Sequence, residues 1–360
     1  ICSRMSRFPV GENTQLAKSQ EGSLVLDSIT ISFWVYSLAI VALGVFSARF
    51  AKQTEADFFL ADRGLGAWVV RMRSIAASPY HSRVTEAVEP TTTDSGRTAS
   101  AGRVRLRSIA LPTEHGGWGF TLEPILLGLL VAPSAAAWEL SAAALGIFLA
   151  RRPVKLVSTD LVRKRWLPRS RIALIFALIY GGLALAGTIG AFYTAEGPFW
   201  IAVLVAIPFA LIALRADAQS KNRALIPELS GSIAMGATVS AIALGSGWDL
   251  GPAFGLWLVL AARDIAAIVL VRGQIRRLKK RPVGASAIYI VQGACVGAVA
   301  LAAAWGGVPW LSVVAIALVG LVSIVSLNRP PIEARVIGWT QMGVGLMVVV
   351  LTAAGVHLGW

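Results

Sequence analysis

The residues of this chain most able to do chemistry are four charged side chains inside or at the edge of long apolar runs. Arg263 and Asp264 are adjacent in "LWLVLAARDIAAIVLVR", while Glu123 and Glu228 each stand beside a proline near the start of an apolar run. A charge at the centre of a membrane helix costs about 2.5–3.5 kcal/mol on insertion scales, so such residues are expected to face a partner or a cavity. The pattern indicates an ion pair, a ligand site or a proton site.

Helix geometry limits how these charges can pair. Adjacent residues point about 100° apart on a helix, so Arg263 and Asp264 are expected to satisfy each other poorly and to need partners on other helices. Either Glu123 or Glu228 is expected to pair with Arg263. Two interpretations stay open, an ion pair that locks the bundle and a ligand or proton site. The second is favoured, because ionisable residues inside membranes are functional by default.

A second polar group precedes the long apolar domain, in "LPTEHGGWGF" at residues 111–120. Its glycines allow an irregular backbone, whose free N–H groups beside a helix start can bind an anion. The alternative is an interfacial loop, with Trp118 as a membrane-belt residue and His115 in solvent. Seven residues are therefore candidates for substrate binding: Glu114, His115, Trp118, Glu123, Glu228, Arg263 and Asp264.

Other chemistry has little support in this sequence. There are three histidines and two cysteines, the HExxH spacing is absent, and Cys2 and Cys295 lie in contexts too different to pair. We therefore predict no catalytic residue, no metal site and no cofactor. The basic net charge of +14 does not indicate nucleic-acid binding, because the cations cluster between apolar runs, where they orient a membrane protein and attract anionic lipid.

The elements that must position these groups are membrane helices. Hydrophobic residues make up 56% of the chain and charged residues only 14%, against about 25% charged in soluble domains. Many apolar runs approach the roughly 20 residues that a bilayer requires. We predict an all-α polytopic transmembrane helix bundle of about ten membrane segments, a first helix at 29–48 and a nine-segment domain. The nine are expected at about 118–132, 135–150, 172–193, 199–214, 225–245, 252–271, 284–304, 309–327 and 336–356.

The connections between these segments alternate in charge. The connections at 151–171, 215–224, 272–283 and 328–335 hold eight, three, six and two Lys or Arg, and the connections between them hold none. Basic loops lie on the cytoplasmic side. We therefore predict a multi-pass protein of the cell membrane with cytoplasmic basic loops and the C-terminus outside. The segments at about 118–132 and 135–150 are short and flank Pro133, which indicates a re-entrant or tilted hairpin.

Composition divides the chain into four parts. These are a polar tail at 1–28, the first helix and following segment at 29–78, a Ser/Thr/Arg-rich cytoplasmic linker at 79–110, and the nine-segment domain at 111–360. Small residues recur four apart at Ser232, Gly236 and Ser240, and again at Gly293 and Gly297. Such spacing lets helix backbones approach closely in lipid, so both sets are expected at helix contacts.

Two family resemblances cover different parts of the chain. Residues of about 30–78, with "EADFFLADRGLGAWVV" and "SIAAS", resemble the N-terminal end of the sodium:solute symporter family. Residues of about 108–360 resemble the YwiC-like family of bacterial membrane proteins, through "LPTEHGGWGFTLEPILLGLL", "FLARRPVKL", "RKRWLPRSR", "ELSGSIA" and "LVLAARDIAAIVLVRGQIR". The first resemblance implies a symporter's opening helix, and the second implies a membrane protein without implying an activity.

These features favour a non-enzymatic membrane protein that binds or transports a small solute or lipid through a polar cleft open to the cytoplasm. Its expected partners are the bilayer and that ligand, and no nucleic acid. One alternative is an intramembrane transferase similar to the UbiA-type prenyltransferases. Those enzymes hold Mg²⁺ and a diphosphate on paired Asp-rich motifs, whereas the corresponding loops here offer Asp160 alone. Another alternative is a truncated symporter fused to the YwiC-like domain.

Overall fold

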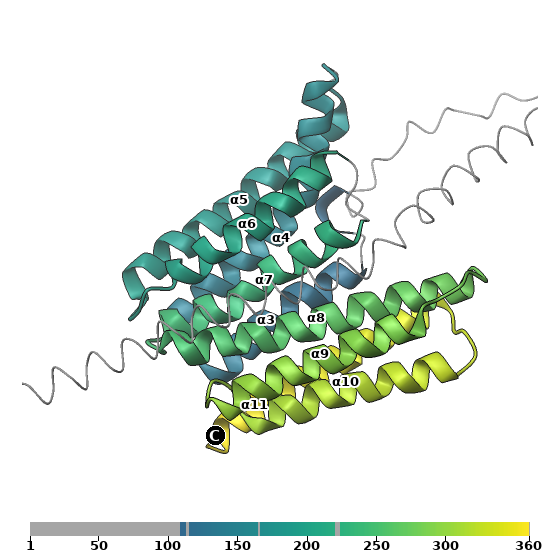
Figure 1. Ribbon diagram of the computed structural model, residues 1–360. Coiled ribbons are helices and arrows are strands. Elements are labelled where there is room, and N and C mark those ends of the chain that lie inside the picture. The colour runs from purple at the N-terminus through teal and green to yellow at the C-terminus, as the bar shows by residue number, and fades with distance from the viewer. Residues whose placement is uncertain (1–108, 113–114, 165, 220–223, 360) are drawn as a thin grey trace, which may run out of the picture.

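The computed structural model describes residues 109–112, 115–164, 166–219 and 224–359, and the regular elements within these ranges are helices (Figure 1). The predicted polar tail at 1–28, the first membrane helix at 29–48, the symporter-like stretch at 30–78 and nearly all of the linker at 79–110 lie outside the described residues. The helices are α3 (His115–Val131), α4 (Ala135–Val162), α5 (Pro168–Thr194), α6 (Trp200–Ala218), α7 (Leu225–Gly245), α8 (Leu250–Leu278), α9 (Ala285–Ala304), α10 (Trp310–Asn328) and α11 (Ala334–His357).

The predicted apolar segments each correspond to one of these helices, so the all-helical fold class is confirmed for the described part of the chain. Seven helices there, α5 to α11, are long and apolar enough to cross a membrane. Much of α5 and α6 is exposed apolar surface, as expected for helices that face lipid. The described residues therefore form a multi-pass helical membrane protein. They contain seven candidate membrane spans and two further helices, α3 and α4.

Two connections that the sequence indicated as loops are partly helical. Helix α4 continues through the basic stretch to Val162, and α8 continues to Leu278. Apolar content marks only the part of a helix that suits the bilayer, whereas Lys, Arg and Leu also favour helix outside it. Several Lys and Arg residues of these connections therefore lie within the C-terminal parts of α4 and α8 and not in loops.

The helices alternate in direction, so the connections gather at two ends of the bundle. At one end, called the basic end here, the ends of α4, α6, α8 and α10 meet the starts of α5, α7, α9 and α11. Arg277 there donates to the carbonyls of Ser326 and Arg329 at 3.1 and 2.8 Å. At the opposite end the hydroxyls of Ser134 and Ser246 lie 2.7 Å apart. The charge alternation of the sequence thus corresponds to two spatial ends.

Helix α8 forms the centre of the bundle and is almost entirely buried. Helices α7, α9, α10, α11 and α3 pack around it, and α4, α5 and α6 form an outer group on the far side of α7. Figure 1 shows this outer group above α7 and α8, with α9, α10 and α11 below them. Helix α8 is therefore positioned to hold charged groups away from lipid.

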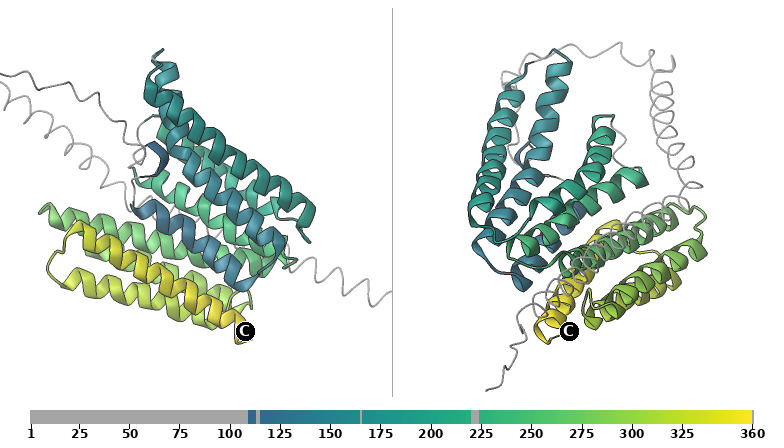
Figure 2. Two further views of the ribbon diagram at one scale, coloured as in Figure 1. Left: turned by 180° about the vertical axis from the view of Figure 1, so that it is seen from behind. Right: turned by 60° about the vertical axis from the view of Figure 1, so that its left-hand side comes forward.

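Helix α3 lies in the interior and does not form a shallow re-entrant turn. Figure 2 shows it from behind, running beside α11, and it also packs against α7 and α8. Its 17 residues extend over about 25 Å. At its far end the Leu130 carbonyl is 2.9 Å from His357 Nε2, close to the last turn of α11. The predicted hairpin of α3 and α4 is thus a pair of antiparallel helices.

The two sets of small residues have different outcomes. Gly236 on α7 leaves room for Trp257 of α8, whose Nε1 donates to the Ile233 carbonyl at 2.8 Å, and Ser240 donates to the Ala253 carbonyl at 2.7 Å. The prediction of a helix contact is confirmed there. It is wrong for Gly293 and Gly297, where an added Cβ would meet no atom within 4 Å. Spacing alone does not tell which face a helix turns inward.

This difference predicts opposite results for one substitution. Gly236→Leu is expected to lower the free energy of unfolding by about 1–3 kcal/mol, because the larger side chain must displace Trp257. Gly297→Leu enters open space, so it is expected to be neutral or stabilising by up to about 1 kcal/mol, because leucine is a better helix former than glycine. Thermal unfolding followed by circular dichroism in mild detergent measures both. Equal losses in the two variants would contradict the assigned contact.

Candidate functional site

The structure separates the predicted site residues into groups. Glu114 lies outside the described residues, and His115 is the first residue of α3. Trp118 donates its indole N–H to the Pro112 carbonyl at 3.4 Å and packs edge-on against Phe148 with ring centres 5.2 Å apart. Trp118 therefore supports the start of α3. The four charged candidates lie deeper, in two distinct places.

Glu123, Arg263 and Asp264 form a buried ion cluster inside the bundle. Arg263 Nη2 is 2.7 Å from Glu123 Oε1, and its Nη1 is 3.3 Å from Asp264 Oδ1. All three residues are at most 5% exposed. The predicted pairing of Arg263 with Glu123 is confirmed. Arg263 and Asp264 also contact each other, at the longer distance, and each has a partner on another helix as expected. The arginine side chain is long enough to bring its guanidinium beside the carboxylate of the next residue.

Neighbouring helices complete the surroundings of this cluster. From α11 the Gln341 carbonyl accepts from Arg263 Nη2 at 2.8 Å, and Gly345 leaves the space that the Glu123–Arg263 pair occupies. From α7 the Ser232 hydroxyl lies within hydrogen-bonding reach of the Asp264 carboxylate. Helices α3, α7, α8 and α11 therefore all contribute to the cluster, which explains why it lies where they meet.

The cluster is incompletely paired. Neither oxygen of Glu123 takes part in a well-formed hydrogen bond, although one lies close to Arg263, and Arg263 Nε and Gln341 Oε1 also have no hydrogen-bond partner. A buried polar group without a partner costs about 1–3 kcal/mol, more when it is charged. A cluster that served only to fasten the helices would be expected to satisfy these atoms.

A cavity of about 400 Å³ opens among the ends of the helices at the basic end, and we call it the main pocket. Its walls combine cationic and apolar side chains. The cationic residues are Arg151, Arg272, Arg276, Lys279 and Arg281. The apolar residues include Phe120, Phe148, Ala213, Met235, Val271 and Ile275. Such a lining suits a molecule that has an anionic group and an apolar body.

Among the described residues that line the main pocket, Glu228 is the single carboxylate, and it does not reach Arg263. It pairs instead with Arg272 of α8, whose Nη2 is 2.7 Å from Glu228 Oε2. Its predicted pairing with Arg263 is therefore wrong. Arg151 is engaged by Asp217 of α6 at 3.2 Å. Among the described residues of its lining, five charged side chains are cationic and one is a carboxylate.

Two residues connect the main pocket to the buried cluster. Phe120 lines the pocket, and the Arg263 guanidinium carbon lies 5.7 Å from the centre of its ring, a favourable cation–π distance. Ser232 also lines the pocket and reaches Asp264. The cluster therefore lies directly behind the floor of the pocket. Neither Phe120 nor Ser232 was a candidate from sequence, because neither is unusual in an apolar run.

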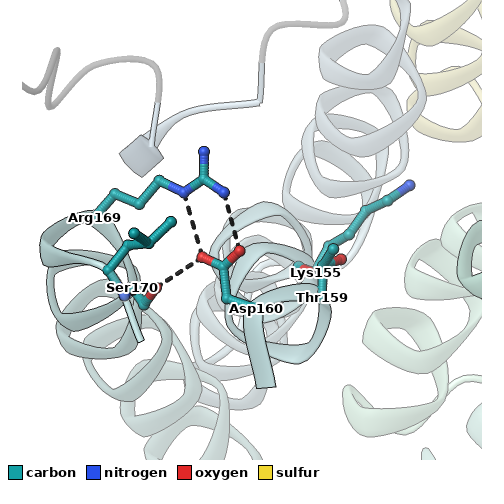
Figure 3. Close-up of polar contacts among 6 residues, drawn as sticks. Lys155, Thr159, Asp160, Arg169 and Ser170 are labelled. Atoms are coloured by element: carbon teal, nitrogen blue, oxygen red, sulfur yellow. Dashed lines mark hydrogen bonds and ion pairs between the residues drawn. The ribbon is translucent and has the colours of Figure 1, made fainter. Parts of the chain in front are cut away.

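A second polar network joins α4 to α5 at the basic end (Figure 3). The buried Asp160 carboxylate accepts from Arg169 at 2.9 and 3.3 Å and from the Ser170 hydroxyl at 2.7 Å. The Asp160 charge is thus paired locally, with two residues at the start of α5. A cavity of about 310 Å³ lies beside this network. Both acids of its lining, Asp160 and Asp217, are bonded to cations.

The Asp160 network predicts an acid-sensitive corner between α4 and α5. Hydrogen bonds from Arg169 and Ser170 hold the pKa of the Asp160 carboxyl below its ordinary value. Because the folded state then binds fewer protons than the unfolded state, the stabilisation is complete above the ordinary pKa and is lost as the pH falls through the lowered value. Backbone hydrogen exchange at this corner should accelerate upon such acidification. Asp160→Asn should accelerate it already at neutral pH, and Asp249→Asn at the opposite end should leave it unchanged.

Comparison with known proteins adds a family likeness for part of this domain. Residues 111–243 match the family model described as YwiC-like protein. The match runs from just before α3 almost to the end of α7, so it includes Glu123 and Glu228 but not Arg263. The symporter-like stretch lies outside the matched residues. Neither the curated proteins nor the solved structures give a match.

Proposed function

We propose that this membrane protein binds an amphiphilic oxyanion, a molecule with a phosphate- or sulfate-like head and an apolar body, in the main pocket. The observation that carries the proposal is the lining of that pocket, whose described residues include five cations and one carboxylate beside apolar walls. Charge-assisted hydrogen bonds from Arg and Lys would hold the head. Burial of the apolar body against residues such as Phe120 and Met235 would add affinity.

The proposal includes an orientation. The nineteen Lys and Arg of the four basic connections favour the cytoplasm for the basic end, which puts the C-terminus outside. The main pocket would then open toward the cytoplasm or the inner headgroup layer. A ligand would reach it from either source, as a lipid from the bilayer or as a solute from water.

Binding of short alkyl anions tests this function. The full chain is placed in discs of zwitterionic lipid, and the binding of hexyl phosphate, hexyl sulfate and inorganic phosphate is measured by calorimetry against empty discs. We expect both hexyl anions to bind, and to bind more weakly as salt is added, because exposed charges are screened. Inorganic phosphate should bind more weakly, since it lacks the apolar body. Equal affinity for inorganic and hexyl phosphate would instead indicate a solute site for small anions.

Matched variants assign the binding to the main pocket. Replacing Arg276 and Lys279 together by glutamine removes two pocket cations and should weaken hexyl phosphate binding at least about tenfold. Replacing Arg171 and Arg335 together removes the same charge outside the pocket lining and should weaken it far less. Equal weakening in both double variants would show that general surface charge, and not this pocket, attracts the anion.

A further inference from the structure

The buried cluster has an unbalanced charge. It contains the carboxyl groups of Glu123 and Asp264 but only one guanidinium, that of Arg263. With all three groups ionised it would carry one negative charge inside an apolar bundle. A buried charge without a counter-charge is unfavourable and is commonly removed by binding a proton.

The helices packed around the cluster bring no second cation to it within the described residues. Helix α7 contributes Ser232, while its Glu228 is engaged with Arg272 nearer the basic end. Helix α11 contributes the Gln341 carbonyl and Gly345, and its titratable Arg335 and His357 lie in its first and last turns. From α9 the Cys295 thiol lies at the Ala266 backbone. Helix α10 has no charged residue within its bounds.

The unpaired atoms of the cluster indicate where a proton would go. Glu123 Oε2 has no hydrogen-bond partner, whereas Glu123 Oε1 has the ion-pair contact with Arg263 but no well-formed hydrogen bond. A carboxylic acid has an O–H donor that a carboxylate lacks. A proton on the Glu123 carboxyl would therefore remove the excess negative charge. It would also give Glu123 an O–H donor in place of an acceptor that has no partner.

We propose that the Glu123–Arg263–Asp264 cluster is a proton-binding site linked to anion binding in the main pocket. This inference rests on the proposed function for its second half. A proton passes from water at the basic end to a carboxylate oxygen of the cluster, and no other bond is formed or broken. Phe120 and Ser232 are the shared wall between cluster and pocket. An anion in the pocket adds negative charge beside the cluster, which favours the cluster's protonated form.

Infrared spectroscopy of the ligand-free full chain tests the proton site. We expect a carbonyl stretching band of a protonated carboxylic acid that shifts in deuterated water and disappears at alkaline pH. Glu123→Gln or Asp264→Asn, both isosteric, should remove it, and Glu228→Gln should leave it. The absence of such a band in the wild-type chain, a readout that requires no variant, would overturn the proposal. So would a band that persists in both cluster variants.

Proton uptake during binding tests the link. Hexyl sulfate, whose head does not titrate near neutral pH, is added to the weakly buffered full chain at the pH where the infrared band of the ligand-free chain is half lost. Uptake of up to about one proton per bound hexyl sulfate is expected in the wild type and much less in Glu123→Gln. Hexyl sulfate binding without proton uptake would overturn the link. An infrared band in a protein that binds no hexyl anion would overturn the proposed function and leave the proton site standing.

Discussion

Replacement of Arg263 by glutamine is expected to lower the free energy of unfolding by about 3–5 kcal/mol, because it leaves two carboxyl groups buried without their counter-charge. The loss should be greatest at alkaline pH, where a proton is least available to neutralise them. Glu123→Gln should cost less, since Arg263 keeps Asp264 as a partner. Chemical unfolding of the full chain in mild detergent, followed by tryptophan fluorescence, measures these differences.

Two controls connect the loss to the buried position. Arg272→Gln breaks the partly exposed pair with Glu228 and is expected to cost no more than about 1 kcal/mol. Exchange of the charges in a Glu123→Arg, Arg263→Glu double variant should recover part of the stability lost in Arg263→Glu alone. A Glu228→Arg, Arg263→Glu variant should recover none, and recovery there would show that the assigned pairing is wrong.

Gly345→Ala is the second substitution with a large expected effect, although it adds a single methyl group. The new Cβ would overlap both Glu123 Oε1 and Arg263 Nη2. Either the ion pair separates or α11 moves away from α3 and α8. We expect a loss of about 3–5 kcal/mol in the free energy of unfolding, as when a buried pair is broken. Unfolding in mild detergent measures this loss, and the infrared band of the cluster should change with it.

Gly343 provides the matched control on the same helix. An added Cβ there meets no atom within 4 Å. Since alanine is a better helix former than glycine, Gly343→Ala should be neutral or stabilising by up to about 1 kcal/mol. Shortening the acid in a Gly345→Ala, Glu123→Asp double variant should recover part of the loss. If Gly345→Ala proves as harmless as Gly343→Ala, the cluster does not pack against α11 as described.

Much of the helix pattern and part of the site could be predicted from sequence. Apolar length located the segments of α3 to α11, and the alternating charge of the connections separated the two ends of the bundle. The pairing of Arg263 with Glu123 followed from the cost of burying a charge. The choice between Glu123 and Glu228 could not be predicted, because both acids follow helix starts and both pair with an arginine of α8. Only packing decides which acid lies at Arg263 and which at Arg272.

Neutral residues of the site could not be recognised as site residues from the sequence. Ser232, Phe120 and Gly345 are ordinary residues for an apolar helix, and their roles arise from what lies opposite them in the fold. The same reasoning explains the failure at Gly293 and Gly297, whose spacing resembles that of Gly236 but whose surroundings are open. A pattern along one helix carries no information about its neighbour's position.

The enclosure of α8 has a mechanical consequence. This helix carries Arg263 of the cluster and, about two and a half turns onward, Arg272 of the main pocket, while Lys279 of the pocket directly follows its last residue. Because other helices surround α8, we expect it to stay fixed and to hold the ion cluster and the main pocket in a constant relative position. Widening of the pocket would then involve helices other than α8, and α6 is one of them, since it borders the pocket through Ala213 and turns most of its surface outward. Cross-linking α6 to α7 at the basic end should therefore slow ligand exchange while leaving the ion cluster intact.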